Sequence, residues 1–291
     1  HIGLGEANIL NVASNRRILG DDGLVKATRY TACSSAALRA EPEGLIDPAV
    51  SLVSFWNEDK PLAVLSYYAV HPQSYYRTGF ANPDFPGVAR FLRQLAVPEA
   101  LHIHFNGASG DIGAGKYNDG SKENRLALAT RMAEGMKKAW ENTKKERIAS
   151  VQVSWKQESL AFSPAPYLAR LKKELKNTPS LYGENVDYAR KMAWYERCLA
   201  GKKVNISCLS IGRARILHLP SEMFVEYQLA AKNRRPDLFV AVAAYGEYGP
   251  GYIGTDKAYK EGGYETSETA SNVHPETERT LKPAIFKLLE D

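Results

Sequence analysis

Cysteine is scarce in this chain of 291 residues, and the three cysteines present show no CxxC spacing. The sequence therefore predicts neither a zinc knuckle nor a redox-active dithiol, and an odd number of cysteines argues against a disulfide scaffold. Cys198 and Cys208 could pair with each other. We nevertheless expect Cys33, Cys198 and Cys208 to be free thiols.

Long apolar runs, internal repeats and low-complexity tracts are absent as well. No run approaches the roughly 18 apolar residues that a membrane-spanning helix needs, so we expect no transmembrane segment. The first residue is His1, and no signal peptide is visible. With 44% hydrophobic residues and no convincing linker, the chain can bury a substantial core. We expect a single domain over residues 1–291.

Charge of one sign is not concentrated anywhere, because the formal net charge of +5 is spread along the chain. The densest basic stretches, residues 143–147 and 170–174, also contain acids, as is typical of solvated helix faces. No nucleic-acid-binding motif accompanies them. We therefore expect no nucleic-acid partner.

Short apolar runs alternate with helical patterns, which predicts an α/β fold with a mixed β-sheet core flanked by helices. We expect strands at residues 50–56, 61–70, 101–105, 206–219 and 238–244. We expect helices at residues 121–143, 166–176, 186–199, 222–232 and 283–289, with Ser121 and Ser221 as N-caps. Residues 106–115 and 245–264 are rich in glycine and predict loops.

His71 stands at the carboxyl end of an expected strand, which Pro72 terminates. Open α/β sheets place their sites at such strand ends, so His71 could ligate a metal or act as a general base. A single histidine in a turn is more often structural. His102 and His104 alternate along the next expected strand and share one face. They could bind a metal together, although a structural role is favoured.

Glu222 follows an expected strand at the start of an expected helix, where the positive helix end favours a carboxylate. Taken alone, Glu222 is an ordinary first-turn acid. The loop at residues 245–264 is rich in tyrosine, and phenols there could donate to an oxyanion or ligate a metal. Such clusters usually just pack on the domain. These tyrosines are Tyr245, Tyr248, Tyr252, Tyr259 and Tyr264.

Three short motifs occur in a characteristic order along the chain. Ala13-Ser14-Asn15-Arg16-Arg17 comes first, then Tyr68-Ala69-Val70-His71-Pro72, and Asp84-Phe85-Pro86-Gly87 follows. Together with the tyrosine-rich loop, they resemble the neutral/alkaline non-lysosomal ceramidase family over most of the chain. The resemblance implies a catalytic domain with a zinc site.

The resemblance also implies roles for five residues of this chain. Three of them would ligate the zinc ion: His71, Glu222, and Tyr252 of the Tyr-Ile-Gly-Thr motif at residues 252–255. Tyr264 would be a second active-site tyrosine, and Arg16 would contact the substrate.

Two departures from the family stand out. The family's first zinc histidine lies in an HxH motif upstream of the Asn-Arg segment, and no such motif precedes residues 13–17 here. We therefore expect the N-terminal segment of the catalytic domain to be missing from this chain. Gly113 stands where the family has an active-site serine, which argues against ceramide itself as the substrate. We also expect this chain to lack the family's C-terminal immunoglobulin-like domain.

The function implied by the resemblance is zinc-dependent hydrolysis of an amide bond by a metal-activated water. The substrate would be an N-acyl lipid, a ceramide-like molecule or a smaller N-acyl amine. The resemblance also implies Zn²⁺ as the cofactor, an extracellular or periplasmic location and peripheral contact with a membrane surface. The main alternative is a catalytically silent ceramidase-like binding module, which Gly113 and the missing histidine motif favour. A serine hydrolase at Ser109 is a distant third, because the surrounding loop is not a nucleophile elbow.

Overall fold

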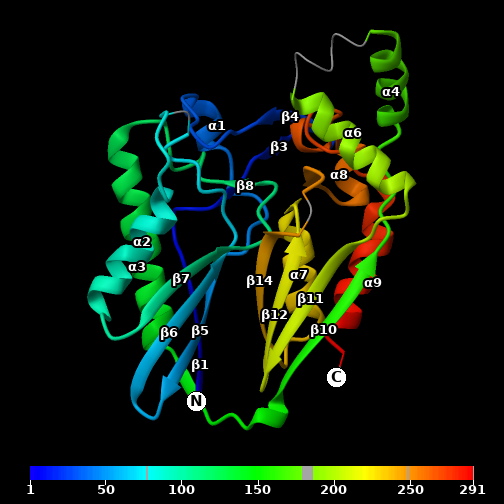
Figure 1. The fold of residues 1–291 in the computed structure, drawn as a ribbon. Helices are drawn as coiled ribbons and strands as arrows, with labels where there is room; N and C mark the ends of the chain where they lie inside the picture. Colours follow the sequence, from blue (N-terminus) through cyan, green and yellow to red (C-terminus); the bar gives the residue numbers. More distant parts are fainter. Residues whose placement is uncertain (77, 179–185, 248, 291) are drawn as a thin grey trace.

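The computed structural model describes residues 1–76, 78–178, 186–247 and 249–290, and two mixed β-sheets form its centre (Figure 1). The first sheet is built from β1 (Ile2–Asn8), β5 (Ala49–Asn57), β6 (Lys60–Tyr68), β7 (Leu101–Asn106) and β9 (Lys144–Glu146). Their order across the sheet is β7-β6-β5-β1-β9. β6 and β7 run parallel, and the other neighbours run antiparallel.

The second sheet is built from β10 (Val153–Leu160), β11 (Val204–Ile211), β12 (Ala214–Pro220) and β14 (Phe239–Gly246). Their order is β10-β11-β12-β14, with β12 and β14 parallel and the other pairs antiparallel. Strand β14 contacts β7 and β6, so the two sheets lie face to face.

Helices cover the outer side of each sheet, which gives the molecule four layers (Figure 1). An apolar cluster that includes Phe85 and Met132 joins the first sheet to its helices, and a second cluster, with Trp194 and Phe224, does the same for the second sheet. A third cluster, which includes Val53 and Ile216, lies between the sheets. The predicted α/β fold class is confirmed. The covering helices are α2 (Asp84–Ala96) and α3 (Lys122–Glu141) on the first sheet, and α7 (Val225–Arg234) and α9 (Glu278–Leu288) on the second. Helices α4 (Tyr167–Asn177) and α6 (Val186–Leu199) pack on each other near one end of the second sheet (Figure 1).

Short elements connect these layers. They are β2 (Ser14–Asn15), β3 (Arg17–Leu19), β4 (Val25–Thr28), β8 (Ile112–Gly113), β13 (Glu222–Met223), β15 (Tyr252–Ile253), α1 (Ala36–Ala40), α8 (Asp256–Glu261) and the 3-10 turns η1 (Ser150–Gln152), η2 (Tyr264–Thr266) and η3 (Pro275–Thr277).

The predicted strand at residues 206–219 is wrong, because these residues form a hairpin. β11 ends at Ile211 and β12 begins at Ala214, and Gly212 makes the turn with a φ of +55°. Both strands lie inside the second sheet and are buried along most of their length. A strand buried on both faces reads as a continuous apolar run, so the apolar pattern conceals the turn.

The predicted helix start at Glu222 is also wrong. Ser221 has a φ of +61°, a left-handed conformation, and it does not cap a helix. Glu222 and Met223 instead form β13, which pairs in parallel with β15. Helix α7 begins only at Val225. Glu222 is therefore held by strand pairing rather than by a helix end.

The last third of the chain holds further corrections. The predicted loop at residues 245–264 contains β15 and α8. Helix α9 begins at Glu278 and continues through Pro283, the residue at which the sequence predicts its start.

All three cysteines are free thiols as predicted, so the alternative pairing of Cys198 with Cys208 is wrong. In the described part of the chain, no helix combines the length and apolar character needed to cross a bilayer.

Candidate active site

His71 lies just beyond β6 and is almost completely buried, with 3% of its surface exposed. Its Nδ1 lies 2.6 Å from the backbone oxygen of Ser109 and 3.0 Å from that of Ile112. Because carbonyl oxygens only accept hydrogen bonds, Nδ1 must carry a hydrogen. Nε2 lies 2.9 Å from Oε2 of Glu222, 151 residues further along the chain.

Glu222 reaches His71 from β13. Burial by itself raises the pKa of Glu222, but contacts with His71 and Tyr252 and the charge of Arg16 outweigh burial and lower it. The carboxylate is therefore anionic at neutral pH. The glycine-rich loop passes directly against this strand, since a Cβ on Gly110 would lie 2.2 Å from the backbone oxygen of Glu222. Only glycine allows this approach.

Tyr252 stands beside Glu222 because β15 pairs with β13 in register. Its hydroxyl lies near enough to the Glu222 carboxylate and to Arg16 to affect the pKa values of both. Its ring centroid lies 6.1 Å from that of His71. Burial, the largest effect, raises the pKa of the Tyr252 hydroxyl well above its usual value, even though Arg16 opposes the shift.

Arg16 adds a buried positive charge to this group. Its Nη2 donates to the backbone oxygen of Gly110 at 2.7 Å, and its Nε lies 3.2 Å from Oε1 of the fully buried Glu265. The guanidinium carbon lies 5.3 Å from the Tyr252 ring centroid. A Cβ on Gly113 would lie 3.3 Å from Cδ of Arg16, so the position that holds a serine in the family faces this arginine.

Tyr264 lies at the outer edge of the site, with 36% of its surface exposed. Its ring packs edge-to-face against Tyr252 at 5.8 Å and against Tyr30 at 5.9 Å. The structure thus brings together all five side chains selected from the sequence. Their roles as zinc ligands or catalytic groups stay predictions.

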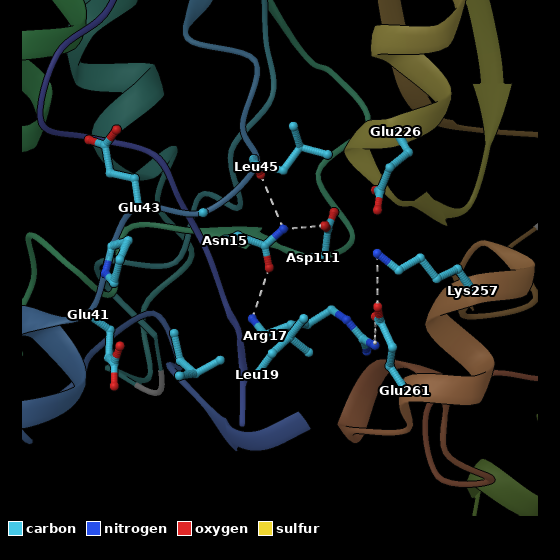
Figure 2. A pocket seen from close by; sticks show the side chains of 13 residues that line it. Asn15, Arg17, Leu19, Glu41, Glu43, Leu45, Asp111, Glu226, Lys257 and Glu261 are labelled. Carbon is cyan, nitrogen blue, oxygen red and sulfur yellow. Dashed lines mark hydrogen bonds and ion pairs between the residues drawn. The ribbon is translucent and has the colours of Figure 1, made fainter. Parts of the chain in front are cut away.

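Asn15 and Arg17, the neighbours of Arg16, face a separate pocket of about 390 Å³ (Figure 2). There the Asn15 amide donates to Oδ2 of the buried Asp111 at 2.6 Å, and Oδ1 of Asp111 accepts from the backbone of Val225 at 2.9 Å. Asp111 therefore ties the Arg16 segment to the start of α7, three residues after Glu222. Burial and the neighbouring Glu226 raise the pKa of Asp111 to about 7.

Comparison with known proteins yields structural relatives only. No protein-family model and no curated protein matches the sequence. The solved neutral ceramidase from Pseudomonas aeruginosa superposes with a TM-score of 0.63 at 16% sequence identity, over 99% of this chain and 51% of that chain. A structure of a ceramidase complexed with C2 gives a TM-score of 0.64 at 15% identity, over 99% and 52% of the two chains. This chain has a ceramidase-like fold. It spans about half the length of those enzymes.

Within this ceramidase-like fold, Tyr245 is a site residue that sequence reasoning named in its loop but did not select. Its hydroxyl lies 2.8 Å from Oγ of Ser109 and 3.5 Å from Nε2 of His71. Tyr245 and Ser221 both have positive φ values, of +63° and +61°. Left-handed backbone at non-glycine residues is costly and is concentrated at functional sites. Tyr248 lies outside the described residues.

Ser109 lacks the partner that a serine nucleophile needs. Its side chain is fully buried, and its Oγ contacts the Tyr245 hydroxyl. Within the described ranges, no hydrogen bond joins this Oγ to a histidine. The geometry therefore gives the serine-hydrolase alternative no support, because a base within hydrogen-bond reach is required to activate the hydroxyl.

The donor set of this site fits a zinc ion. Two backbone carbonyls hold Nδ1 of His71, so Nε2, which faces the Glu222 carboxylate, is the nitrogen that would bind a cation. A histidine whose Nδ1 donates to backbone carbonyls has the arrangement typical of metal ligands. No group of three or more His, Cys, Asp or Glu gathers anywhere in the described residues. If zinc binds here, Tyr252 is placed beside Glu222 to supply a phenol oxygen as a further ligand.

Proposed function

We propose that this chain is a zinc-dependent hydrolase of amide bonds, with His71, Glu222 and Tyr252 holding the ion. The observation that carries the proposal is the 2.9 Å approach of His71 Nε2 to the Glu222 carboxylate, while Nδ1 is held by two carbonyls. Zinc supplies a Lewis acid and lowers the pKa of water towards about 7.

The surrounding residues suit hydrolysis of a carbonyl compound. Arg16 is held rigidly by Glu265 and Gly110, so its charge is already in position to stabilise a developing oxyanion. Tyr264, which is 36% exposed, packs against Tyr252 at the edge of the site and could supply a second donor. Each such donor contributes about 3–4 kcal/mol to the stabilisation of a transition state.

We further propose that the substrate is an N-acyl lipid or a smaller N-acyl amine. The exposed ring of Tyr30 packs against Tyr264 at the edge of the site and offers an apolar surface for an acyl chain. The structural relatives are ceramidases by name, which favours the same class of bond. An extracellular or periplasmic location and peripheral contact with a membrane surface belong to this proposal as well.

A catalytically silent binding module is the second candidate. Gly113 favours it, because the resemblance implies a serine at this position, which lies against the Arg16 side chain. Such a module would keep the fold and bind an N-acyl molecule without cleaving it.

The test combines metal analysis with a panel of N-acyl amines and N-acyl lipids on the zinc-loaded protein. We expect about one zinc ion per chain and measurable turnover, and the loss of both in His71→Ala. The matched control is His274→Ala, which removes a histidine that caps η3 and should change neither quantity. Zinc binding without turnover would favour the binding module, and protein that takes up no zinc would contradict the proposal.

A further inference from the structure

A second pocket, of about 400 Å³, lies between the start of α2 and the edge strand β7. Its polar lining comes from Arg90 of α2 and from His102, His104 and Asn106 of β7, and its apolar walls are three prolines and Ile103. None of its described lining residues is acidic. The volume is typical of a site for a small organic molecule.

Arg90 brings an unneutralised positive charge to this pocket. The residue is half-buried, and its guanidinium donates to the backbone oxygen of His102 at 3.3 Å. Within the described part of the chain, no ion pair involves Arg90. A partly buried charge without a counter-charge is unfavourable in free energy. An anion bound in this pocket would therefore stabilise the charge of Arg90.

The two histidines lie on the face of β7 that packs beneath α2. His102 has 7% of its surface exposed, and Nε2 of each ring is buried without a hydrogen-bond partner in the described residues. On the other side of the His104 ring, Nδ1 lies 2.9 Å from Oγ of Ser66.

The charges around these rings favour an anion over a metal ion. Burial, followed by the charge of Arg93, lowers the pKa of His102 to about 4, and burial does the same for His104. Arg90 and Arg93 would repel a divalent cation at this place. The same two charges attract a carboxylate, which a guanidinium can bind through two parallel hydrogen bonds.

We propose that this pocket is a binding site for a small carboxylate with a short apolar body. Arg90 would hold the carboxylate, His102 and His104 would line the site beside it, and the prolines would contact the apolar part. The site is separate from the zinc site proposed above, and its existence does not depend on amide hydrolysis.

Isothermal titration of the full chain with butyrate, and in parallel with inorganic phosphate, tests the proposal. We expect butyrate to bind more tightly than phosphate and Arg90→Gln to weaken butyrate binding about tenfold or more, as expected for the loss of charge-assisted hydrogen bonds. The matched control is Arg279→Gln. Arg279 lines another pocket, of about 390 Å³, together with His274, but it is already paired with Asp256 and Glu276. This control should leave the affinity for butyrate unchanged.

Binding can also be followed without any substitution, which covers the case that Arg90→Gln fails to fold. Butyrate should shift the imidazole resonances of His102 and His104 in the unmodified protein and leave those of His274 in place. Three results would overturn the proposal: no butyrate binding, phosphate binding more tightly than butyrate, or zinc uptake that His102→Asn lowers.

Discussion

Gly110 is the residue whose size most directly constrains the candidate site. Its missing side chain lets the loop at residues 106–115 contact the backbone of β13, and the same loop supplies the carbonyl oxygen of Ser109 to His71. Because the atoms in the way belong to the backbone, a larger residue cannot be accommodated by a side-chain rotation. The close packing of Gly110 against β13 therefore helps to hold Glu222 in position.

We predict that Gly110→Ala lowers the free energy of unfolding by about 1–3 kcal/mol, as overpacking usually does. The variant should also bind less zinc, because Glu222 is displaced. Urea unfolding and metal analysis measure the two effects. Gly249→Ala is the control, since a Cβ at that position meets no atom within 4 Å. Equal stabilities of the two variants would contradict the prediction.

His102 and His104 make stability depend on pH. Their pKa values are lowered from 6.5 to about 4 in the folded chain. Between these values the unfolded chain binds more protons, so stability falls as the pH decreases from 6.5 to 4. We predict that His104→Gln reduces this fall by about 1–3 kcal/mol. Urea unfolding at several pH values, in buffers without carboxylates, measures it. An unchanged pH dependence would mean that His104 titrates normally.

At the scale of elements, the pairing of β13 with β15 assembles the site. The two short strands place Glu222 directly beside Tyr252, and helix α8 follows immediately. The Thr255 hydroxyl caps α8 by accepting from the backbone N–H of Ala258 at 3.1 Å. A stable helix α8 therefore helps to hold β15, the strand that carries Tyr252, in place.

We predict that Thr255→Ala costs about 1 kcal/mol of stability, the usual value for the loss of an N-cap. Ser121→Ala is the matched control, because Ser121 occupies the N-cap of α3 without a side-chain capping bond to the backbone; its hydroxyl instead accepts from the exposed Asn124 amide at 2.9 Å. Its effect should stay below about 0.5 kcal/mol. Thermal unfolding distinguishes the two variants, and a larger loss in Ser121→Ala would refute the assignment of these caps.

At the scale of the whole molecule, contact between the two sheets determines whether the site exists. His71 follows a strand of the first sheet, whereas Glu222 and Tyr245 lie at the ends of strands of the second. The apolar cluster between the sheets therefore sets the distance between these side chains. Ile216, which is 1% exposed, lies near the middle of this cluster.

We predict that Ile216→Ala destabilises the chain by about 2–5 kcal/mol through the cavity it leaves. Unfolding should remain a single transition, because the damaged interface joins the two halves. The control is Val151→Ala, at a position that is 87% exposed, with an expected change below about 0.5 kcal/mol. Urea denaturation followed by fluorescence and by circular dichroism tests both points, and two separate transitions would contradict a single domain.

The sequence by itself determined what depends on neighbouring residues. Periodicity located β5, β6, β7, β14, α3, α4 and α6 to within about two residues, because burial on one face imposes a repeat on the chain. The sequence analysis did not predict β1, α2 or β10. The position of His71 at a strand end follows from the apolar run and Pro72. The resemblance to the ceramidase family, which the motifs and their order carry, selected Arg16, His71, Glu222, Tyr252 and Tyr264, and the structure brings them together.

Only the tertiary structure decided what depends on residues distant in the chain. The turn at Gly212 and the strand position of Glu222 were missed, because neither burial on both faces nor a left-handed serine leaves a local pattern. Tyr245 could not be chosen from among its neighbours until β14 was placed against β7. The carboxylate pocket likewise exists only because α2 packs over His102. Local sequence fixes which face each residue occupies, whereas distances across more than a hundred residues are set by how the sheets and helices pack.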